Sequence, residues 1–215
     1  MQIELTYTNG ERLHYLLHIP PNSEDGFHPL ILFLHGAGER GDDLSMLKKH
    51  GIPKVVEQDQ NFPFITASPQ CPTGSWWTEK VEVLKGLLDQ VVASYPIDSE
   101  RLYLTGLSMG GYGSWALAMA YPEVFAAAAP ICGRGNPLQA DRIKDLPLWV
   151  FHGDRDIVVP FQHSQDMVTA LKAVGSQVRF TIYPDTGHDS WTQTYDNPDL
   201  YQWFLKHCSR STVHY

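Results

Sequence analysis

The stretch Gly106-Leu-Ser-Met-Gly-Gly111 decides the fold of this chain. An apolar run at 101–105 precedes it and predicts a buried strand, and a mainly apolar run at 112–120 follows it and predicts a covered helix. A serine between small residues on such a sharp strand-to-helix turn holds its hydroxyl above the end of a sheet. Ser108 is therefore a candidate nucleophile. Taken alone, the motif also fits a glycine-rich turn without chemistry.

The length and charge of the chain restrict its class. The 215 residues predict a single domain, 1–215, with 43% hydrophobic and 19% charged residues, as is ordinary for a globular protein. The 16 basic residues against 24 acidic ones leave a formal charge of -8. This balance argues against a nucleic-acid partner, because phosphates bind a basic face. A small molecule is the expected partner, and the chain is expected to be a monomer or homodimer.

The N-terminus and the cysteines predict a cytoplasmic protein. The first eight residues lack a basic segment followed by an apolar one, so no signal peptide is expected. No apolar stretch approaches the ~18 residues of a membrane span, so no membrane insertion is expected. The three cysteines are odd in number and far apart, which argues against a disulfide framework or a thiolate metal site. They are Cys71, Cys132 and Cys208.

Alternating strand and helix patterns predict an α/β fold. Runs at 3–8 and 12–19 flank Asn9-Gly10, a strong hairpin signal, and 29–34 reads as a strand buried on both faces. The other expected elements are helices at 43–50, 79–94, 161–174 and around 200–205, and strands at 62–67, 125–132, 147–151 and 178–183. This order predicts a mostly parallel sheet with an N-terminal antiparallel hairpin and helices on both faces.

Ligands of such sheets bind at the carboxyl ends of the strands, where Ser108, Asp156 and His188 are all expected. A serine hydroxyl needs a base to take its proton, and the base needs an acid to orient it. The order Ser…Asp…His is that of α/β-hydrolases. Ser108 is thus predicted as nucleophile, His188 as general base and Asp156 as orienting acid. Asp154 and, more remotely, Asp185 are the alternatives for the acid.

An acyl-transfer site also needs donors for a negative oxygen. The backbone amide of Met109, at the start of the predicted helix, is one candidate. The second should come from the glycine-rich loop 35–41, and Ala37 is preferred over Gly38. A phosphate-binding loop is disfavoured here, because the third glycine of the dinucleotide motif and the Gly-Lys-Ser/Thr of a P-loop are both missing.

These motifs together resemble the α/β-hydrolase superfamily, in particular its single-domain carboxylesterases and the predicted peptidases grouped with dienelactone-hydrolase-like proteins. The matching stretches are Leu-His-Gly-Ala-Gly-Glu-Arg-Gly at 34–41, Pro-Gln-Cys-Pro at 69–72, Gly-Leu-Ser-Met-Gly-Gly at 106–111, His-Gly-Asp-Arg-Asp at 152–156 and Gly-His-Asp-Ser-Trp at 187–191. The resemblance implies that the acid is the second Asp of His-Gly-x-x-Asp, which is Asp156. A dienelactone hydrolase proper has a cysteine as nucleophile, so Ser108 departs from it and favours ester chemistry.

The remaining expectations concern the substrate. The link 133–146 is too short for a lid, so an open site for short-acyl, soluble esters is expected. Gly38, Trp77 and Trp191 are the predicted substrate contacts, and packing in the core is the alternative for each tryptophan. No cofactor and no metal site are expected, because no metal-ligand spacing of the His-x-x-x-His type is placed on a helix. The predicted function is a serine carboxylesterase. A thioesterase, an amidase or peptidase, and a non-catalytic binding protein on the same fold are the alternatives.

Overall fold

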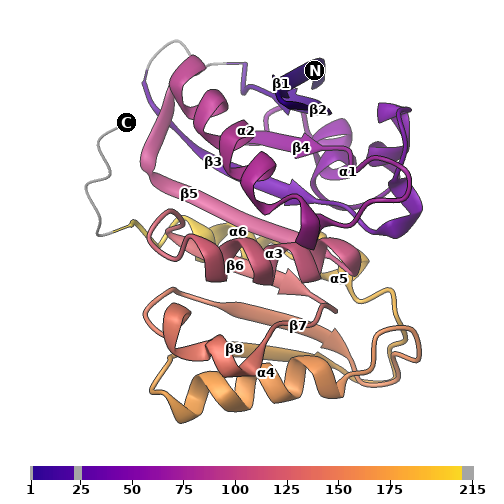
Figure 1. The fold of residues 1–215 in the computed structure, drawn as a ribbon, viewed down its shortest axis with the longest axis vertical. Coiled ribbons are helices and arrows are strands. Elements are labelled where there is room, and N and C mark those ends of the chain that lie inside the picture. The colour runs from indigo at the N-terminus through magenta and orange to yellow at the C-terminus, as the bar shows by residue number, and fades with distance from the viewer. Residues whose placement is uncertain (1, 22–25, 210–215) are drawn as a thin grey trace.

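One eight-stranded sheet organises residues 2–21 and 26–209, which are the residues that this computed structural model describes (Figure 1). The strand order is β1-β2-β4-β3-β5-β6-β7-β8. β1 and β2 pair antiparallel, as do β2 and β4, and all other pairs are parallel. The strands are β1 Gln2–Asn9, β2 Glu11–His18, β3 His28–Leu34, β4 Ile65–Pro69, β5 Ile97–Leu107, β6 Ala127–Ile131, β7 Trp149–Gly153 and β8 Arg179–Tyr183.

Helices cover both faces of the sheet (Figure 1). They are α1 Gly51–Gln58, α2 Val81–Ser94, α3 Met109–Ala120, α4 Gln162–Ala173, α5 Trp191–Tyr195 and α6 Pro198–Phe204. Leu30, Leu32 and Leu34 of β3 pack with α2, α3 and α4, whereas Ile31 and Phe33 pack with α1, α5 and α6. Successive side chains of a strand point to opposite faces, so a strand buried on both sides is apolar throughout.

The expected fold class is confirmed. The sheet is mostly parallel, the antiparallel hairpin turns at Asn9-Gly10 with Gly10 at φ +73°, and both faces carry helices. The link from β6 to β7 contains only one 3₁₀ helix, η5 Pro137–Ile143, and therefore no lid. Within the described ranges, no helix is long and apolar enough to cross a bilayer.

Two expected elements between β3 and α2 are misplaced by sequence reasoning. The helix expected at 43–50 is a 3₁₀ helix, η3 Leu44–Lys49, and the α-helix α1 follows it. Because of Pro53, the sequence did not predict α1, although a proline in the first turn of a helix removes no intrahelical hydrogen bond. The strand expected at 62–67 is β4, which begins only at Ile65, after Pro63. Pro63 lacks the N–H that a ladder bond requires.

The nucleophile segment also starts its helix earlier than expected. α3 begins at Met109, directly after Ser108, rather than at Tyr112. The glycines at 110 and 111 disfavour a helix by intrinsic propensity. Close packing requires them: a Cβ on Gly110 would collide with the carbonyl of Leu34, and one on Gly111 with the carbonyl of Ile131. Tertiary contact therefore overrides propensity and brings the start of α3 against the ends of β3 and β6.

Candidate active site

Ser108 occupies the strained turn between β5 and α3. Its backbone has φ 52° and ψ -115°, a conformation that residues with a side chain rarely adopt. The Ser108 N–H donates to the Ile131 carbonyl at the end of β6 at 3.0 Å, which ties the turn to the neighbouring strand. A Cβ on Gly106 would collide with the carbonyl of Gly110, so the chain can turn this sharply only with glycine there. Strain of this kind collects at functional sites.

A continuous hydrogen-bonded chain joins the three residues predicted as nucleophile, base and acid. His188 Nε2 lies 2.9 Å from Ser108 Oγ, and His188 Nδ1 lies 2.7 Å from Asp156 Oδ2. Because a carboxylate only accepts, Nδ1 carries the proton, and Nε2 accepts from the serine hydroxyl. These residues come from the loops after β5, β7 and β8, which all end at the carboxyl edge of the sheet.

Asp156 is held by four donors. Its Oδ1 accepts the backbone N–H groups of Val158 and Val159 at 2.8 and 2.9 Å, and its Oδ2 accepts from His188 and from His152 Nε2 at 3.2 Å. Burial opposes ionisation of this carboxyl, but the bonds from His188, Val159 and Val158 outweigh it and hold its pKa below the ordinary value. Asp156 is thus a buried carboxylate that faces the imidazole of His188.

His152 holds Asp156 in place through a hydrogen bond. It is fully buried at the end of β7, with Nε2 2.9 Å from the Val159 carbonyl and Nδ1 2.7 Å from Ser164 Oγ. Burial lowers its pKa, so the ring is neutral and its Nε2–H is shared between Val159 and Asp156. The sequence indicated a structural or supporting role for this histidine, and its contacts agree with that interpretation.

The other acids lie elsewhere. Asp154 is exposed, and its backbone N–H donates to the Tyr183 carbonyl at 3.1 Å. Asp185 is exposed and forms an ion pair with Arg155. No hydrogen bond joins either carboxylate to His188 in the described part of the chain, so of the three candidate acids the structure brings Asp156 to the imidazole.

The loop after β3 is fixed by a second buried histidine. His35 Nε2 accepts the N–H of Cys71 at 2.9 Å, and its Nδ1–H donates to the Gly36 carbonyl at 2.5 Å. Burial lowers its pKa to about 4, which keeps the ring neutral. Since Gly110 packs on Leu34 and on the His35 carbonyl, this loop lies against the start of α3.

Two backbone amides near Ser108 lack an internal partner. The N–H groups of Ala37 and Met109 donate to no acceptor among residues 2–21 and 26–209. Arg40 steadies the loop, because its guanidinium donates to the carbonyls of Ala37 at 3.0 Å and of Ser75 at 3.4 Å. Gly38 is exposed, with open space where a Cβ would stand. These amides are free to bind an oxygen of a ligand.

The expectation for Trp77 as a substrate contact is wrong. Its side chain is 0% exposed and donates Nε1–H to the His35 carbonyl at 3.0 Å, so it packs beneath the loop. Trp191 differs: it is half-buried at the start of α5, and its ring lies edge-on to His188 with centroids 5.1 Å apart. The sequence does not show the direction in which Trp77 points, because Trp77 and Trp191 both fall in expected loops and no local pattern distinguishes them.

Cys132 lies near the site, and the sequence favoured a buried small apolar residue over a second nucleophile at this position. It is fully buried at the end of β6, where its backbone has φ 39°. The ligand-type atoms of Cys132, Asp156 and His188 all lie within 4.8 Å of one another. The only signal in the sequence was its position at a strand end, at the same edge as Ser108.

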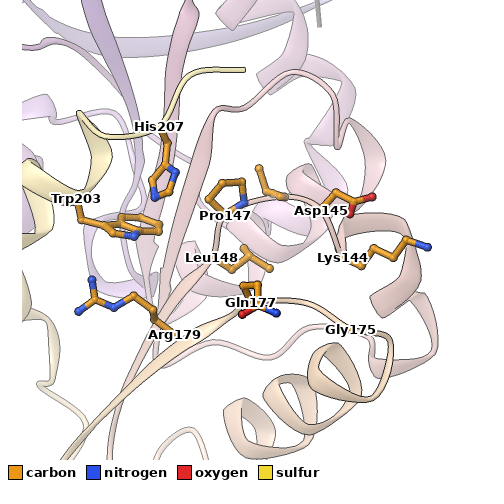
Figure 2. Close-up of a pocket in the computed structure, with 10 residues that line it drawn as sticks. Lys144, Asp145, Pro147, Leu148, Gly175, Gln177, Arg179, Trp203 and His207 are labelled. Atoms are coloured by element: carbon orange, nitrogen blue, oxygen red, sulfur yellow. The ribbon is translucent and has the colours of Figure 1, made fainter. Parts of the chain in front are cut away.

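A separate pocket lies at the opposite edge of the sheet (Figure 2). Its volume is 380 Å³, and its lining includes Leu148 and Arg179, at the amino ends of β7 and β8, and Trp203 of α6. The guanidinium of Arg179 lies over the Trp149 ring, 3.6 Å from its centroid. None of the residues of the hydrogen-bonded chain lines this pocket.

Comparison with known proteins identifies the family. The chain belongs to the dienelactone hydrolase family, whose model matches residues 66–201. Carboxylesterase SOBER1 of Arabidopsis thaliana is 30% identical over 74% of this chain and 82% of its own length. The bifunctional acetylxylan esterase/xylanase XynS20E of Neocallimastix patriciarum is 27% identical over 86% of this chain but only 26% of its own length. The chain therefore spans about a quarter of that relative.

A solved structure described as a thermostable esterase superimposes with a TM-score of 0.89 and 34% identity. It covers 96% of this chain, which in turn covers 63% of that structure. The Pyrococcus horikoshii acylaminoacyl peptidase, at 15% identity and a TM-score of 0.73, shares the α/β-hydrolase fold. The fold is thus common to esterases and peptidases, and the chemistry has to be argued from the site.

Proposed function

We propose that this protein is a serine carboxylesterase that hydrolyses short-acyl, soluble esters. The observation that carries the proposal is the chain of hydrogen bonds from Ser108 Oγ through His188 to Asp156, at 2.9 and 2.7 Å. A hydroxyl, an imidazole and a buried carboxylate in this order are the parts of a nucleophilic triad. Relatives named as carboxylesterases support the reaction type.

The proposed reaction has two halves. Ser108 Oγ attacks the ester carbonyl while His188 Nε2 takes the hydroxyl proton, and Asp156 stabilises the imidazolium that forms. His188 then gives this proton to the departing alcohol, which leaves an acyl group on Ser108. Water, deprotonated by the same nitrogen, attacks the acyl-enzyme, and the acid is released. The reaction as written needs no cofactor.

The N–H groups of Ala37 and Met109 are the proposed oxyanion donors. Both donate to no acceptor within the described part of the chain, and Met109 is the first residue of α3, where the helix dipole favours a negative charge. A donor of this kind typically contributes about 10²–10³ to kcat. Because both are backbone groups, their positions depend on the glycines at 36 and 110 rather than on their own side chains.

The preference for small substrates rests on the surroundings of the triad. The link from β6 to β7 carries only η5, so no inserted lid covers Ser108. Trp191 stands beside His188, and the exposed apolar side chains of Ile157 and Val158 directly follow Asp156. An open, partly apolar rim suits a short acyl chain in water.

The test is hydrolysis of p-nitrophenyl esters of increasing acyl length by the wild type and by Ser108→Ala. We expect turnover that is highest for short acyl groups and is lost in the variant. Ser114→Ala is the matched control, because Ser114 lies on α3 and its hydroxyl donates to the Gly110 carbonyl at 2.8 Å. Equal rates in the wild type and Ser108→Ala would refute the serine mechanism.

The same assay separates the leaving groups. Matched ester, thioester and amide substrates with one acyl group are compared by kcat/KM. We expect the ester to be preferred. A higher value for the thioester or the amide would replace the esterase assignment with a thioesterase or an amidase that uses the same three residues. A lack of turnover on all three would favour a binding role.

A further inference from the structure

A buried thiol that the proposed reaction does not use lies beneath the triad. Cys132 directly follows β6, and its N–H donates to the Phe151 carbonyl of β7 at 2.9 Å, so its backbone is fixed by the sheet. Its side chain is 0% exposed. Sγ of Cys132, a carboxylate oxygen of Asp156 and a ring nitrogen of His188 all lie within 4.8 Å of one another, and no other such group of metal-ligand residues exists in the described ranges.

A second observation points to the same place. Ser190 is also 0% exposed, and its hydroxyl has no hydrogen-bond partner within the described residues. Its N–H donates to the His188 carbonyl at 2.8 Å, so this turn holds Ser190 close to the histidine. Burial raises the pKa of the Cys132 thiol to about 12, and the Ser108 backbone and the Ser190 hydroxyl beside the sulfur oppose this shift. The buried Ser190 hydroxyl therefore offers a fourth ligand atom, an oxygen, beside the thiol.

We propose that Cys132, Asp156 and His188 form an inhibitory binding site for a thiophilic divalent cation such as Zn²⁺. Thiolate, imidazole and carboxylate are the three ligand types that Zn²⁺ takes in proteins. The fourth position of a tetrahedron is open to the Ser190 hydroxyl or to water. The ion inhibits the enzyme and is not a cofactor of the reaction.

The binding step balances in protons. Zn²⁺ displaces the proton of the Cys132 thiol, which goes to solvent. The Nδ1 proton of His188 moves to Nε2, so the ring stays neutral, and Asp156 is already a carboxylate. Bonds of about 2.0–2.3 Å place the three ligand atoms roughly 3.5 Å apart around the ion. The Nδ1 to Oδ2 distance of 2.7 Å must therefore widen, and the sulfur must approach by about 1 Å. His188 is carried between exposed residues at 187 and 189, so its loop is the part that adjusts.

Binding of the cation removes the base from catalysis. With Nδ1 bound to the metal, His188 loses the hydrogen bond from Nδ1 to Asp156 that orients Nε2 toward Ser108. The carboxylate is occupied as well, so it no longer stabilises an imidazolium. The inhibition should be reversible by a chelator, because no covalent bond to carbon forms.

The experiment titrates Zn²⁺ against ester hydrolysis in a buffer without chelating groups. Each variant is compared with its own rate in the absence of metal. Cys132→Ser keeps the size of the side chain but removes the soft ligand, and Cys208→Ser, at an exposed cysteine, is the matched control. Changes around a metal site typically cost about 10–100-fold in affinity, so we expect at least about a tenfold weaker inhibition in Cys132→Ser. Cys208→Ser should match the wild type.

A readout without activity accompanies it. One Cd²⁺ per chain should produce the ultraviolet charge-transfer band of a cadmium–thiolate bond in the wild type and in Cys208→Ser, and none in Cys132→Ser. This band needs no turnover, so it tests the metal site even where the proposed esterase function fails. Equal inhibition of the wild type and Cys132→Ser, or a band that persists in Cys132→Ser, would overturn the proposal.

Discussion

Two loops of this protein begin with the same dipeptide at the same edge of the sheet and present opposite chemistry. His35-Gly36 follows β3 and leads to free backbone N–H groups, whereas His152-Gly153 follows β7 and leads to the Asp156 carboxylate. In both loops the histidine is buried, and burial lowers its pKa. Each neutral ring joins the end of its strand to loop backbone through hydrogen bonds.

The two histidines differ in the groups to which they are hydrogen-bonded. His35 binds the backbone of Cys71 from the next loop, and the Ala37 N–H that follows it donates to no acceptor among the described residues. His152 binds the carbonyl of Val159 and the carboxylate of Asp156 within its own loop, and closes that loop around the acid. In the proposed reaction the first loop stabilises negative charge on a substrate, whereas the second loop holds a negative charge of the protein.

The largest expected effect comes from neutralising the acid of the second loop. Asp156→Asn should lower kcat by about 10⁴, because an amide cannot hold the Nδ1–H tautomer of His188 or stabilise its cation. Asp154→Asn is the matched control: its carboxylate is exposed two residues away and should leave kcat unchanged. Steady-state hydrolysis of a short-acyl ester measures both. A large loss in Asp154→Asn with normal Asp156→Asn would exchange the roles.

Replacing the glycine that follows each buried histidine, Gly36 or Gly153, by alanine should affect the two loops differently. A Cβ on Gly153 would collide with the carbonyls of Thr186 and Gly187, so the backbone that carries His188 must move. A displacement of about 1 Å can cost about 10²-fold, which is the loss of kcat expected for Gly153→Ala. A Cβ on Gly36 would meet the ends of two side chains, Leu107 Cδ1 at 2.8 Å and Glu39 Oε2 at 3.2 Å.

Since these side-chain ends can shift, Gly36→Ala should reduce kcat less than Gly153→Ala does. Circular dichroism and thermal unfolding of both variants show whether the fold is retained. Equal losses in the two variants would mean that the His188 loop adapts as readily as a side chain does, which contradicts the comparison of the two loops.

The buried His35 of the first loop should make the free energy of unfolding depend on pH. The pKa of His35 is about 4 in the folded protein and 6.5 in the unfolded chain, so the unfolded chain binds the extra proton between these values. Its stabilising contribution is therefore present above pH 6.5 and is lost as the pH falls toward 4, by roughly 3 kcal/mol in total. His35→Gln does not titrate and should show a correspondingly shallower loss.

Urea unfolding at several pH values between 7 and 4 measures this slope in the wild type and in His35→Gln. The comparison uses the change with pH, so a lower stability of the variant at pH 7 does not affect it. His152 titrates in the same direction and remains in both proteins. Identical slopes would show that His35 is not a buried neutral ring.

The smallest effect is expected at the exposed rim of the second loop. Arg155 and Asp185 form an ion pair with side chains 72% and 73% exposed, and such pairs contribute little. Arg155→Ala should leave kcat and the unfolding temperature unchanged within error. In the first loop, Arg40→Ala should lower kcat several-fold, because Arg40 donates to the Ala37 carbonyl at 3.0 Å and to Ser75. Equal behaviour of the two arginine variants would contradict the comparison.

Residue patterns along the chain were sufficient to predict the class of fold and the candidates for the site. Apolar runs between glycine-rich turns are sufficient to predict a parallel sheet, because buried strands need apolar side chains on both faces. The order Ser108, Asp156, His188 follows from which turns come at strand ends. Local patterns also placed the hairpin at Asn9-Gly10. They misplaced α1 and β4, because the prolines at 53 and 63 act differently at a helix start and in a strand.

Which of these candidates lie in contact depends on the arrangement of the strands in space. In the sequence, several loop residues are equally good candidates for one role. The order of the strands in the sheet determines which of them lie close together. This is why Asp156 rather than Asp154 reaches His188, and why Trp77 points into the core while Trp191 stands beside the imidazole. The thiol of Cys132 belongs to the same group: it lies under the triad because β6 is the neighbour of β5 in the sheet. Distances of this kind depend on strand order and register, and residue patterns along the chain do not contain them.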